Sequence, residues 1–387
     1  ALEPGVDYLN HGSFGACPRA VLEHQGELRA RMERQLIQFL ARDLEGLLDQ
    51  ARGALGEFVG ADPDDLTFVP NATSGVNTVL RSLALEPGDE IVTTDHVYNS
   101  CRNALRWQEE RGVKPLYARV PWPSSGPWQV VESVIGAVTP RTKLVLIDHV
   151  TSPTGLVFPV AEIVRRLPDV DVLIDGAHAP GMLPLDLKAI GAAYYTGNCH
   201  KWLCTPKGSA FLHVRRDRQA SLKPLAYGHG LNSSRTDRSR FRLVFDWGGT
   251  DDPTPFLCIP FALKYLASLM PWPSLMARNH AMAVAGRRIL LAALNVPEPA
   301  PEFMLGSLAS VPLPDWTGEP PPHAGVFWHP FQKQLLQTHR IEVPVMIFPA
   351  LPRQLIRISA QLYNSLDQYS RLAEALRAAT PSETLQS

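Results

Sequence analysis

The clearest candidate for chemistry in this sequence is Lys201, which follows His200 and precedes Trp202 in the segment 196–208. Glycines bound this segment, and an apolar run leads into it. A lysine amine at the end of a buried strand can attack a carbonyl group and form a Schiff base. A surface lysine in a turn is the commoner situation, so Lys201 needs a second element before it argues for chemistry.

That second element is Asp175, which ends the apolar run 172–174 and precedes a glycine. It stands 26 residues before Lys201, which leaves room for one crossover and one strand. An aspartate facing the pyridine nitrogen of pyridoxal phosphate keeps that nitrogen protonated, and the ring can then accept electrons from a bond breaking at the substrate α-carbon. A lone strand-end aspartate is usually a cap, but its pairing with a lysine is much more specific for this cofactor.

A third element, the segment 71–77, directly follows the run 67–69 and opens a helical pattern. Unsatisfied N–H groups and the macrodipole at a helix N-terminus attract phosphate, and Thr73 and Ser74 add hydroxyls there. The simpler interpretation is that these two residues cap a helix.

The elements that must position these residues follow from the pattern between residues 17 and 214. Helical stretches alternate there with short apolar runs, which predicts a mostly parallel sheet with crossover helices. Two predicted strands end in a carboxylate, Asp148 and Asp175, at the edge where open α/β sheets bind ligands. The seven predicted strands are 66–70, 90–94, 115–120, 143–148, 171–175, 192–197 and 209–214, and helices are expected at 74–85, 98–110 and 160–166, among others.

The pattern of apolar and polar residues changes after Thr250. A long amphipathic stretch, 256–294, precedes a proline-rich region and then mixed patterns, in which 366–379 has helical spacing. We therefore predict a domain boundary near residue 255, between a large domain and a smaller one of residues 256–387.

Composition excludes several classes of function. The 387 residues carry 37 basic and 38 acidic side chains, a balance that excludes a polybasic nucleic-acid binder. The sequence has no leader-like N-terminus and no apolar run of about 18 residues, and its five cysteines show no zinc-type spacing. We expect a cytoplasmic protein that binds no nucleic acid, membrane or metal.

Taken together, the motifs resemble the class V aminotransferase family of fold-type I pyridoxal-phosphate enzymes, and within it the isopenicillin N epimerase-like branch. The resemblance runs from 8–15 to 355–359, and its motifs are Asn-Ala-Thr-Ser-Gly at 71–75, Asp-Gly-Ala-His at 175–178, His-Lys-Trp-Leu at 200–203 and Trp-Gly-Gly-Thr at 247–250. It implies an α/β fold in which a large domain of residues 16–255 holds a mostly parallel seven-stranded sheet with helices on both faces. A smaller α+β C-terminal domain follows, and an N-terminal segment, 1–15, packs on that domain and on the active site.

The resemblance also assigns roles to individual residues. It implies that Lys201 holds pyridoxal phosphate and moves the α-proton, that Asp175 faces the pyridine nitrogen, and that His178 lies near the phenolic oxygen. Tyr98 matches the position whose ring stacks on the cofactor, and its phenol could serve as the second acid or base that a racemising enzyme needs. Further cofactor-binding positions are Ala72, Thr73, Ser74, Ser152, Asn198, His200 and Thr250.

The substrate is implied to be an amino acid whose carboxylate Arg357 binds through its guanidinium fork. Asn10 and His11 match the N-terminal segment that closes over the substrate. Thr250 matches a position that reaches the phosphate of the neighbouring subunit, which implies a homodimer with shared active sites. Without the resemblance, Arg357 would pass for a charge on an edge strand.

Two departures from the family pattern limit the substrate. Epimerase-like sequences continue the Gly-Thr motif with an arginine, whereas this chain has Asp251, so a second carboxylate contact is in doubt. Cysteine desulfurases need a thiolate shortly before the carboxylate-binding arginine, and the segment 341–354 contains no cysteine. Sulfur abstraction through a persulfide is therefore not expected.

The leading prediction is an epimerase-like enzyme that abstracts the α-proton of an amino acid. A lyase that eliminates a β-substituent, for instance by cleaving a carbon–sulfur bond, is nearly as well supported, and an aminotransferase stays open. A cofactor-free scaffold is disfavoured by the intact Lys201, Asp175 and Arg357. A nicotinamide oxidoreductase is disfavoured because no GxGxxG motif follows a strand.

Overall fold

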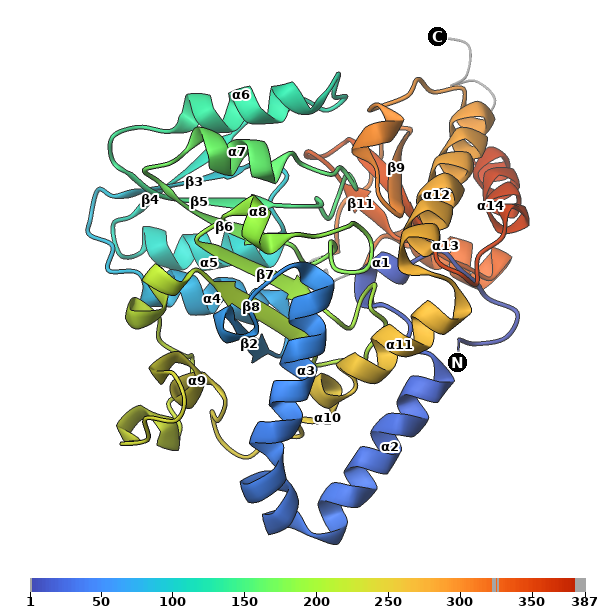
Figure 1. Ribbon diagram of the computed structural model, residues 1–387. Coiled ribbons are helices and arrows are strands. Elements are labelled where there is room, and N and C mark those ends of the chain that lie inside the picture. The colour runs from blue at the N-terminus through green and yellow to red at the C-terminus, as the bar shows by residue number, and fades with distance from the viewer. Residues whose placement is uncertain (1, 322–324, 326, 380–387) are drawn as a thin grey trace.

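A computed structural model describes residues 2–321, 325 and 327–379. Its centre is a seven-stranded sheet in the order β2-β8-β7-β6-β5-β3-β4, in which only β8 runs antiparallel to its neighbours (Figure 1). The predicted fold class is confirmed. The strands are β2 (Leu66–Val69), β3 (Glu90–Thr94), β4 (Lys114–Ala118), β5 (Thr142–Asp148), β6 (Asp171–Asp175), β7 (Tyr194–Asn198) and β8 (Ala210–Val214).

The sheet is buried on both faces because its central strands are apolar without interruption. Along β5, Leu144 and Leu146 face the core beneath α4 (Ala72–Ser82) and α5 (Asn99–Glu109). The alternate residues Val145 and Ile147 face the opposite core. Helices α6 (Pro127–Ala137), α7 (Val160–Arg166) and α8 (Leu187–Ile190) cover that second face. Burial on both faces is the usual state of a parallel sheet whose crossovers are helices.

The smaller part of the molecule is built on three antiparallel strands in the order β11-β12-β9. Two long helices, α12 (Trp272–Leu294) and α14 (Leu366–Ala379), pack together beside it (Figure 1). The strands are β9 (Leu308–Leu313), β11 (Val345–Ile347) and β12 (Gln354–Ser359), accompanied by η5 (Glu302–Met304) and α13 (Pro330–His339).

The stretch 256–294, expected as one amphipathic run, is divided into three helices. The first two, α10 (Thr254–Leu257) and α11 (Ile259–Leu269), pack on the N-terminal helices α2 (Arg19–Arg34) and α3 (Leu44–Val59), whereas α12 packs on β9 and α14. Pro271 separates α11 from α12, because a proline disfavours helical backbone at the residue before it. The boundary near residue 255 stays a prediction, and the last eight residues of the predicted small domain lie outside the described part of the chain.

Two N-terminal helices, α2 (Arg19–Arg34) and α3 (Leu44–Val59), project as a hairpin joined through the π-helical turn η1 (Gln38–Asp43) (Figure 1). Before them, β1 (Asp7–Tyr8) pairs in parallel with β10 (Ile341–Glu342), and α1 (His11–Phe14) follows. The N-terminal residues therefore join the part of the chain that carries Arg357.

Within the described residues, no single helix has the length and apolar character needed to cross a membrane. One bent pair, Thr254–Leu269 with Trp272–Leu294, meets the criterion by length and composition alone, with an angle of 71° between its halves.

Candidate active site

The carboxyl ends of three neighbouring strands bring together Asp148, Asp175 and Asn198, all of them buried. Asp175 Oδ1 accepts the backbone N–H of Ala177 at 3.0 Å, and Oδ2 accepts the Cys101 thiol at 3.2 Å. Burial raises the pKa of Asp175, while these two donors and the charge of a nearby lysine oppose the rise. A carboxylate so placed can pair with a positive ring nitrogen.

Lys201 lies in the loop that follows β7, and its Nζ stands 3.3 Å from His178 Nε2. Burial of the amine and the positive charge of Arg357 lower its pKa to about 7, although Asp175 works in the other direction. A large fraction of Lys201 is therefore neutral near pH 7, and a neutral amine is the form that attacks a carbonyl group or removes a proton.

His178 is buried, and its neighbours fix which ring nitrogen carries the proton. The indole N–H of Trp202 can only donate, and it reaches His178 Nδ1 at 3.5 Å. Burial and nearby positive charges, Lys201 first among them, hold the pKa of His178 well below its usual value, so the ring is neutral. Its proton then sits on Nε2, and His178 presents a donor to the space beside the Lys201 amine.

The expected phosphate end lies at the N-terminus of α4, where Asn71 caps the helix by accepting the N–H of Ser74 at 2.9 Å. The N–H of Ala72 donates to Asn198 Oδ1 at 2.8 Å, which ties the helix to the end of β7. Gly75 permits this close approach, because a Cβ there would come within 2.2 Å of Thr196 Oγ1. Thr73, Ser74 and Asn198 thus gather at one helix terminus that can receive an anion, whereas His200, also expected there, bonds the Ser209 carbonyl through Nδ1 at 2.9 Å.

Tyr98 is the N-cap residue of α5 and leaves 42% of its surface exposed, which is high for an aromatic residue next to a strand end. Tyr98 favours the charged form of Arg357, and the charge of Arg357 acts in turn on Lys201, so the three groups lie around one space. An exposed ring beside buried Asp148 and Asp175 can stack on a planar ligand.

Arg357 comes from β12, which belongs to the three-stranded sheet and not to the large one. Its Nη1 donates to the Ser152 carbonyl and, at 3.3 Å, to Ser152 Oγ, while Nη2 donates to Ser13 Oγ at 3.1 Å. Its buried Nε has no partner in the described part of the chain, and burial lowers its pKa to about 10. Ser152, expected to bind the cofactor, therefore holds the guanidinium group in this structure.

Asn10 and His11, expected to touch the substrate, are both buried and are engaged by protein groups. Asn10 Nδ2 donates to Glu342 at 3.1 Å. His11 Nδ1 faces the N–H of Ala16 and the Tyr363 hydroxyl, and its Nε2 lies 3.0 Å from the Lys201 carbonyl oxygen. Since burial lowers the pKa of His11 to about 3, the ring is neutral and donates from Nε2 to that carbonyl. In this geometry the two residues fasten the N-terminal segment to the lysine loop, and a direct substrate contact stays a prediction.

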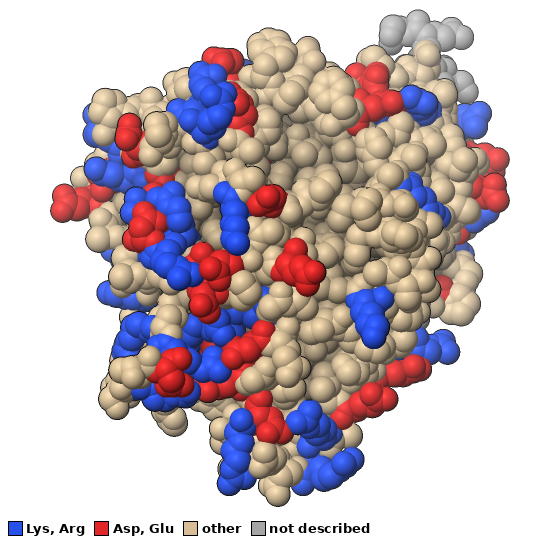
Figure 2. Space-filling model, viewed as in Figure 1, with Lys and Arg blue, Asp and Glu red and all other residues tan. Residues whose placement is uncertain are grey.

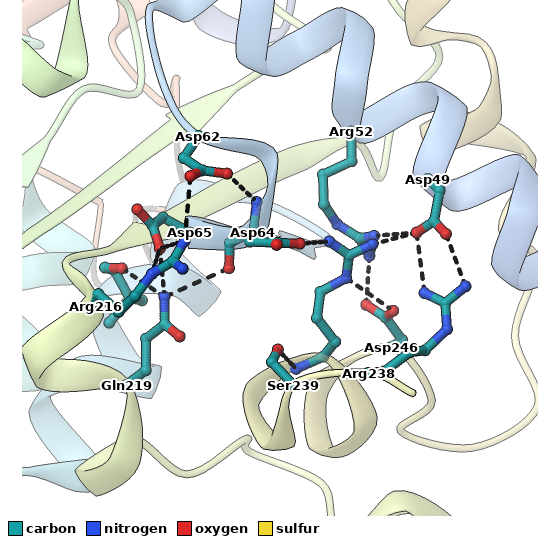
Figure 3. A network of polar contacts seen from close by, with 12 residues as sticks. Asp49, Arg52, Asp62, Asp64, Asp65, Arg216, Gln219, Arg238, Ser239 and Asp246 are labelled. Atoms are coloured by element: carbon teal, nitrogen blue, oxygen red, sulfur yellow. Dashed lines mark hydrogen bonds and ion pairs between the residues drawn. The ribbon is translucent and has the colours of Figure 1, made fainter. Parts of the chain in front are cut away.

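Thr250 is exposed and lines a surface hollow of about 410 Å³ together with Ser74 and Thr78 of α4. The loop that carries it is anchored through Asp246, whose Oδ1 accepts Arg52 Nη2 at 2.5 Å (Figure 3). Arg52 is completely buried, so its pairing with Asp246 is needed to offset the loss of water.

The same network continues outward from Arg52. Its Nη1 donates to Asp49 at 3.1 Å, and Asp49 also accepts Arg238 Nη2 at 2.7 Å (Figure 3). Arg242 joins Asp49 to Asp64. Figure 2 shows basic and acidic residues side by side over the region of α3 and α9 (Arg240–Phe245), in agreement with these ion pairs between arginines and aspartates.

The side chains present fit pyridoxal phosphate. A desolvated lysine amine, a buried carboxylate, an exposed aromatic ring and a helix N-terminus with hydroxyls are the groups that this cofactor needs. Lys201 would hold its aldehyde carbon, Asp175 its ring nitrogen, and Thr73, Ser74 and His200 its phosphate. Among the described residues, no group of three or more His, Cys, Asp or Glu side chains could hold a metal ion.

The low pKa of Lys201 predicts how cofactor-free protein recaptures pyridoxal phosphate. The neutral amine becomes the main form as the pH rises through about 7, so the recapture rate should climb across that pH and then level off. Arg357→Gln removes a positive charge and should move the midpoint to higher pH. Stopped-flow absorbance after cofactor addition measures the recapture rate of the wild type and of the variant. A wild-type midpoint near the ordinary lysine pKa of about 10.4 would contradict the assignment of Lys201 as the amine that captures the cofactor.

Three residues of this site were not expected from the sequence: Ser13, Cys101 and Trp202. Ser13 bonds Arg357 across 344 positions of sequence, and spacing gives no signal for such a contact. Cys101 and Trp202 lie beside residues that were singled out, Tyr98 and Lys201, so their positions within those motifs were the available signal.

Comparisons with known proteins identify the family and the fold of the chain. The model of the family described as Aminotransferase class-V matches residues 17–283. An isopenicillin N epimerase of Streptomyces clavuligerus is 34% identical over 98% of this chain and 96% of its own length. A probable chloroplastic L-cysteine desulfhydrase of Arabidopsis thaliana is 29% identical over 97% of this chain and 83% of its own length.

Solved structures share the fold at lower identity. A cystine C–S lyase bound to its product cysteine persulfide superposes with a TM-score of 0.79 at 22% identity, covering 98% of this chain and 99% of the lyase. A mutant of that lyase, with glycine covalently linked to its PLP cofactor, has a TM-score of 0.77. Together with the lysine, carboxylate and helix terminus described above, these matches show that the chain belongs to the class-V aminotransferase family of pyridoxal-phosphate enzymes.

Proposed function

We propose that this enzyme abstracts the α-proton of an amino acid and returns a proton to the opposite face, as an amino-acid epimerase. The observation that carries the proposal is the convergence of Lys201, Tyr98 and Arg357 on one space, since Arg357 interacts electrostatically both with the Lys201 amine and with the Tyr98 side chain. The relatives named isopenicillin N epimerase, 34% and 35% identical over nearly the whole chain, support it.

Each residue has a defined task in this proposal. Arg357 binds the substrate carboxylate through two parallel hydrogen bonds, for which its Nε is available because it has no hydrogen-bond partner among the described residues. Lys201 takes the α-proton on Nζ, and the Tyr98 phenol supplies a proton from the other side. Bound pyridoxal phosphate supplies an electron sink for the α-carbon, and Asp175 keeps its ring nitrogen protonated.

The Gly249-Thr250 loop continues with two aspartates and no cation. The chain has Asp251 where the resemblance expects an arginine, and the next residue, Asp252, pairs with Arg29 of α2 at 2.7 Å. We therefore infer that this loop does not recognise a second carboxylate and that the substrate side chain differs there from that of isopenicillin N.

A β-eliminating lyase is the second candidate, because relatives named L-cysteine desulfhydrase match 97% of the chain. Elimination needs the same α-proton abstraction by Lys201, after which a sulfur leaves the β-carbon with the bonding electrons and is protonated. It does not need Tyr98. The segment 341–354 has no cysteine, so the leaving sulfur would not pass to a protein thiol there.

Incubating the cofactor-loaded protein with single amino acids in D₂O separates these reactions. Epimerisation yields the other stereoisomer with one deuterium at the α-carbon, seen by chiral chromatography and mass spectrometry. Elimination from L-cysteine or L-cystine yields a keto acid, ammonia and a sulfur product. Loss of racemisation in Tyr98→Phe, with α-deuteration of the unchanged isomer retained, would assign Tyr98. No deuteration of any amino acid would overturn the proposal.

We also infer that two copies of the chain form a homodimer in which Thr250 of one copy reaches the cofactor phosphate of the other. Thr250→Ala should then weaken cofactor retention by roughly 10-fold to 100-fold, the worth of one hydrogen bond to a charged group. Equilibrium dialysis and light scattering measure retention and mass. Thr250→Ser keeps the hydroxyl and should behave as the wild type, whereas a monomer that holds the cofactor normally would refute the shared site.

A further inference from the structure

A second buried carboxyl, Asp148, lies beside Asp175 and has no role in the proposed reaction. The two occupy paired positions at the ends of the parallel strands β5 and β6. Asp148 is 3% exposed, and its Oδ2 has no hydrogen-bond partner within the described residues. Two adjacent carboxyls away from water cannot both carry a charge cheaply, so the pair should hold one proton.

The N-terminus of α5 contacts both carboxyls. The backbone N–H of Tyr98 bonds to Asp148, and the Cys101 thiol of the next turn donates to Asp175 at 3.2 Å. Tyr98 is the N-cap residue, so its backbone position fixes where the aromatic ring stands. The helix that presents the stacking ring is thus seated on the two carboxyls that face the cofactor site.

The surroundings of the two carboxyls differ enough to decide which one is ionised and which one is neutral. Asp175 has two donors, Ala177 and Cys101, and the positive charge of Lys201, all of which favour its anion. Burial raises the pKa of Asp148 well above its usual value, and the charge of Asp175 adds to the rise. The N–H of Tyr98 offsets the rise in part, but no cation among the described residues does so. Two further titratable groups act on the pair, Cys101 and Tyr195, and both keep their protons because burial raises the pKa of each well above its usual value.

We propose that Asp148 is a positioning residue, which seats Tyr98 over the cofactor site as the neutral member of the pair and leaves the negative charge on Asp175. The proposal rests on the assignment of Asp175 and Tyr98 to the cofactor, but not on which reaction follows. Asp148 touches neither substrate nor cofactor in this role.

The test compares the cofactor-loaded wild type with Asp148→Asn, which is neutral and keeps an acceptor for the Tyr98 N–H, and with Asp148→Ala, which removes it. Asp148→Asn should keep the visible spectrum and a turnover close to the wild type. Asp148→Ala should shift the cofactor band and lower turnover by about 10-fold to 100-fold, because the ring is misplaced. Asp175→Asn, the matched isosteric change on the neighbouring strand, should lose turnover, in contrast to Asp148→Asn.

A second readout does not depend on turnover. Stability that comes from the proton on Asp148 is complete below the unfolded-state pKa and is lost as the pH rises through the raised folded-state pKa. The difference in Tm between Asp148→Asn and wild type should therefore grow in favour of the variant as the pH rises above the unfolded-state pKa of about 3.9 and through the raised folded-state pKa. A pH-independent difference, or an Asp148→Asn protein that loses the cofactor band, would overturn the proposal, even if Asp148→Ala does not fold.

Discussion

Lys201→Ala is expected to abolish covalent capture of pyridoxal phosphate and to lower turnover by about 10²–10⁴-fold or more, the contribution typical of a general base. The variant loses both the amine that holds the cofactor and the group that moves the α-proton. The structure explains why no other lysine replaces it: Lys201 is the residue whose Nζ meets His178 and whose pKa is lowered to about 7.

Borohydride reduction of the loaded protein, followed by peptide mass spectrometry, measures the first effect. The modified peptide of the wild type should contain Lys201, and the variant should yield none. Lys207→Ala is the matched control, because Lys207 lies on the same loop and is also partly desolvated. A variant that keeps the reducible visible band would remove Lys201 from its proposed role.

Asp175→Ala should retain some cofactor, because the phosphate contacts and Lys201 remain, but should lose about 10²–10³-fold in turnover. A loss of that size is typical when one preorganised electrostatic partner is removed from a buried site. Without a carboxylate, nothing keeps the ring nitrogen protonated, and the electrons released at the α-carbon have a poorer acceptor.

Steady-state kinetics together with the amount of bound cofactor separates this effect from simple cofactor loss. Asp175→Glu keeps the charge but lengthens the side chain in a site with 4% exposure, so it should recover activity only in part. Near-normal turnover of Asp175→Ala at full occupancy would mean that another group serves the nitrogen, and Asp148 would be the first to test.

Local sequence patterns predict the large sheet closely. Two of its strands, 90–94 and 171–175, have the predicted bounds, because each is a short apolar run closed by polar or glycine residues. The direction of β8 could not be predicted in this way, because an apolar run looks the same in sequence whether the strand is parallel or antiparallel to its neighbours. The break at Pro271 was visible in the sequence, although the stretch 256–294 was treated as one run.

Some residues of the site could likewise be predicted from local sequence patterns, and others could not. Asp175 and Lys201 follow the neighbouring strands β6 and β7, and the segment 71–75 follows β2, which runs in the same direction on the other side of β8, so topology alone brings them to one edge of the sheet. Arg357 reaches this edge from β12, and only the resemblance to a family could place it there. Contacts such as that of Arg52 with Asp246 join residues 194 positions apart by packing, for which the sequence holds no periodic signal.

The N-terminal segment has a consequence for the order in which the active site is completed. Strand β1 pairs with β10, the Leu9 carbonyl accepts the N–H of Ser359, and His11 bonds the Lys201 carbonyl. At the usual synthesis rate of about 5–20 residues per second, the first residues wait roughly 20–70 s for these partners to leave the ribosome.

During that interval the nascent chain already carries Lys201, but the residues that later fasten its loop have no surface to dock on. Leu9, fully buried in the finished protein, stays accessible to water and to chaperones. The lysine loop is therefore fully fastened only after the sequence up to Ser359 has been made, which places productive cofactor capture after that point of synthesis.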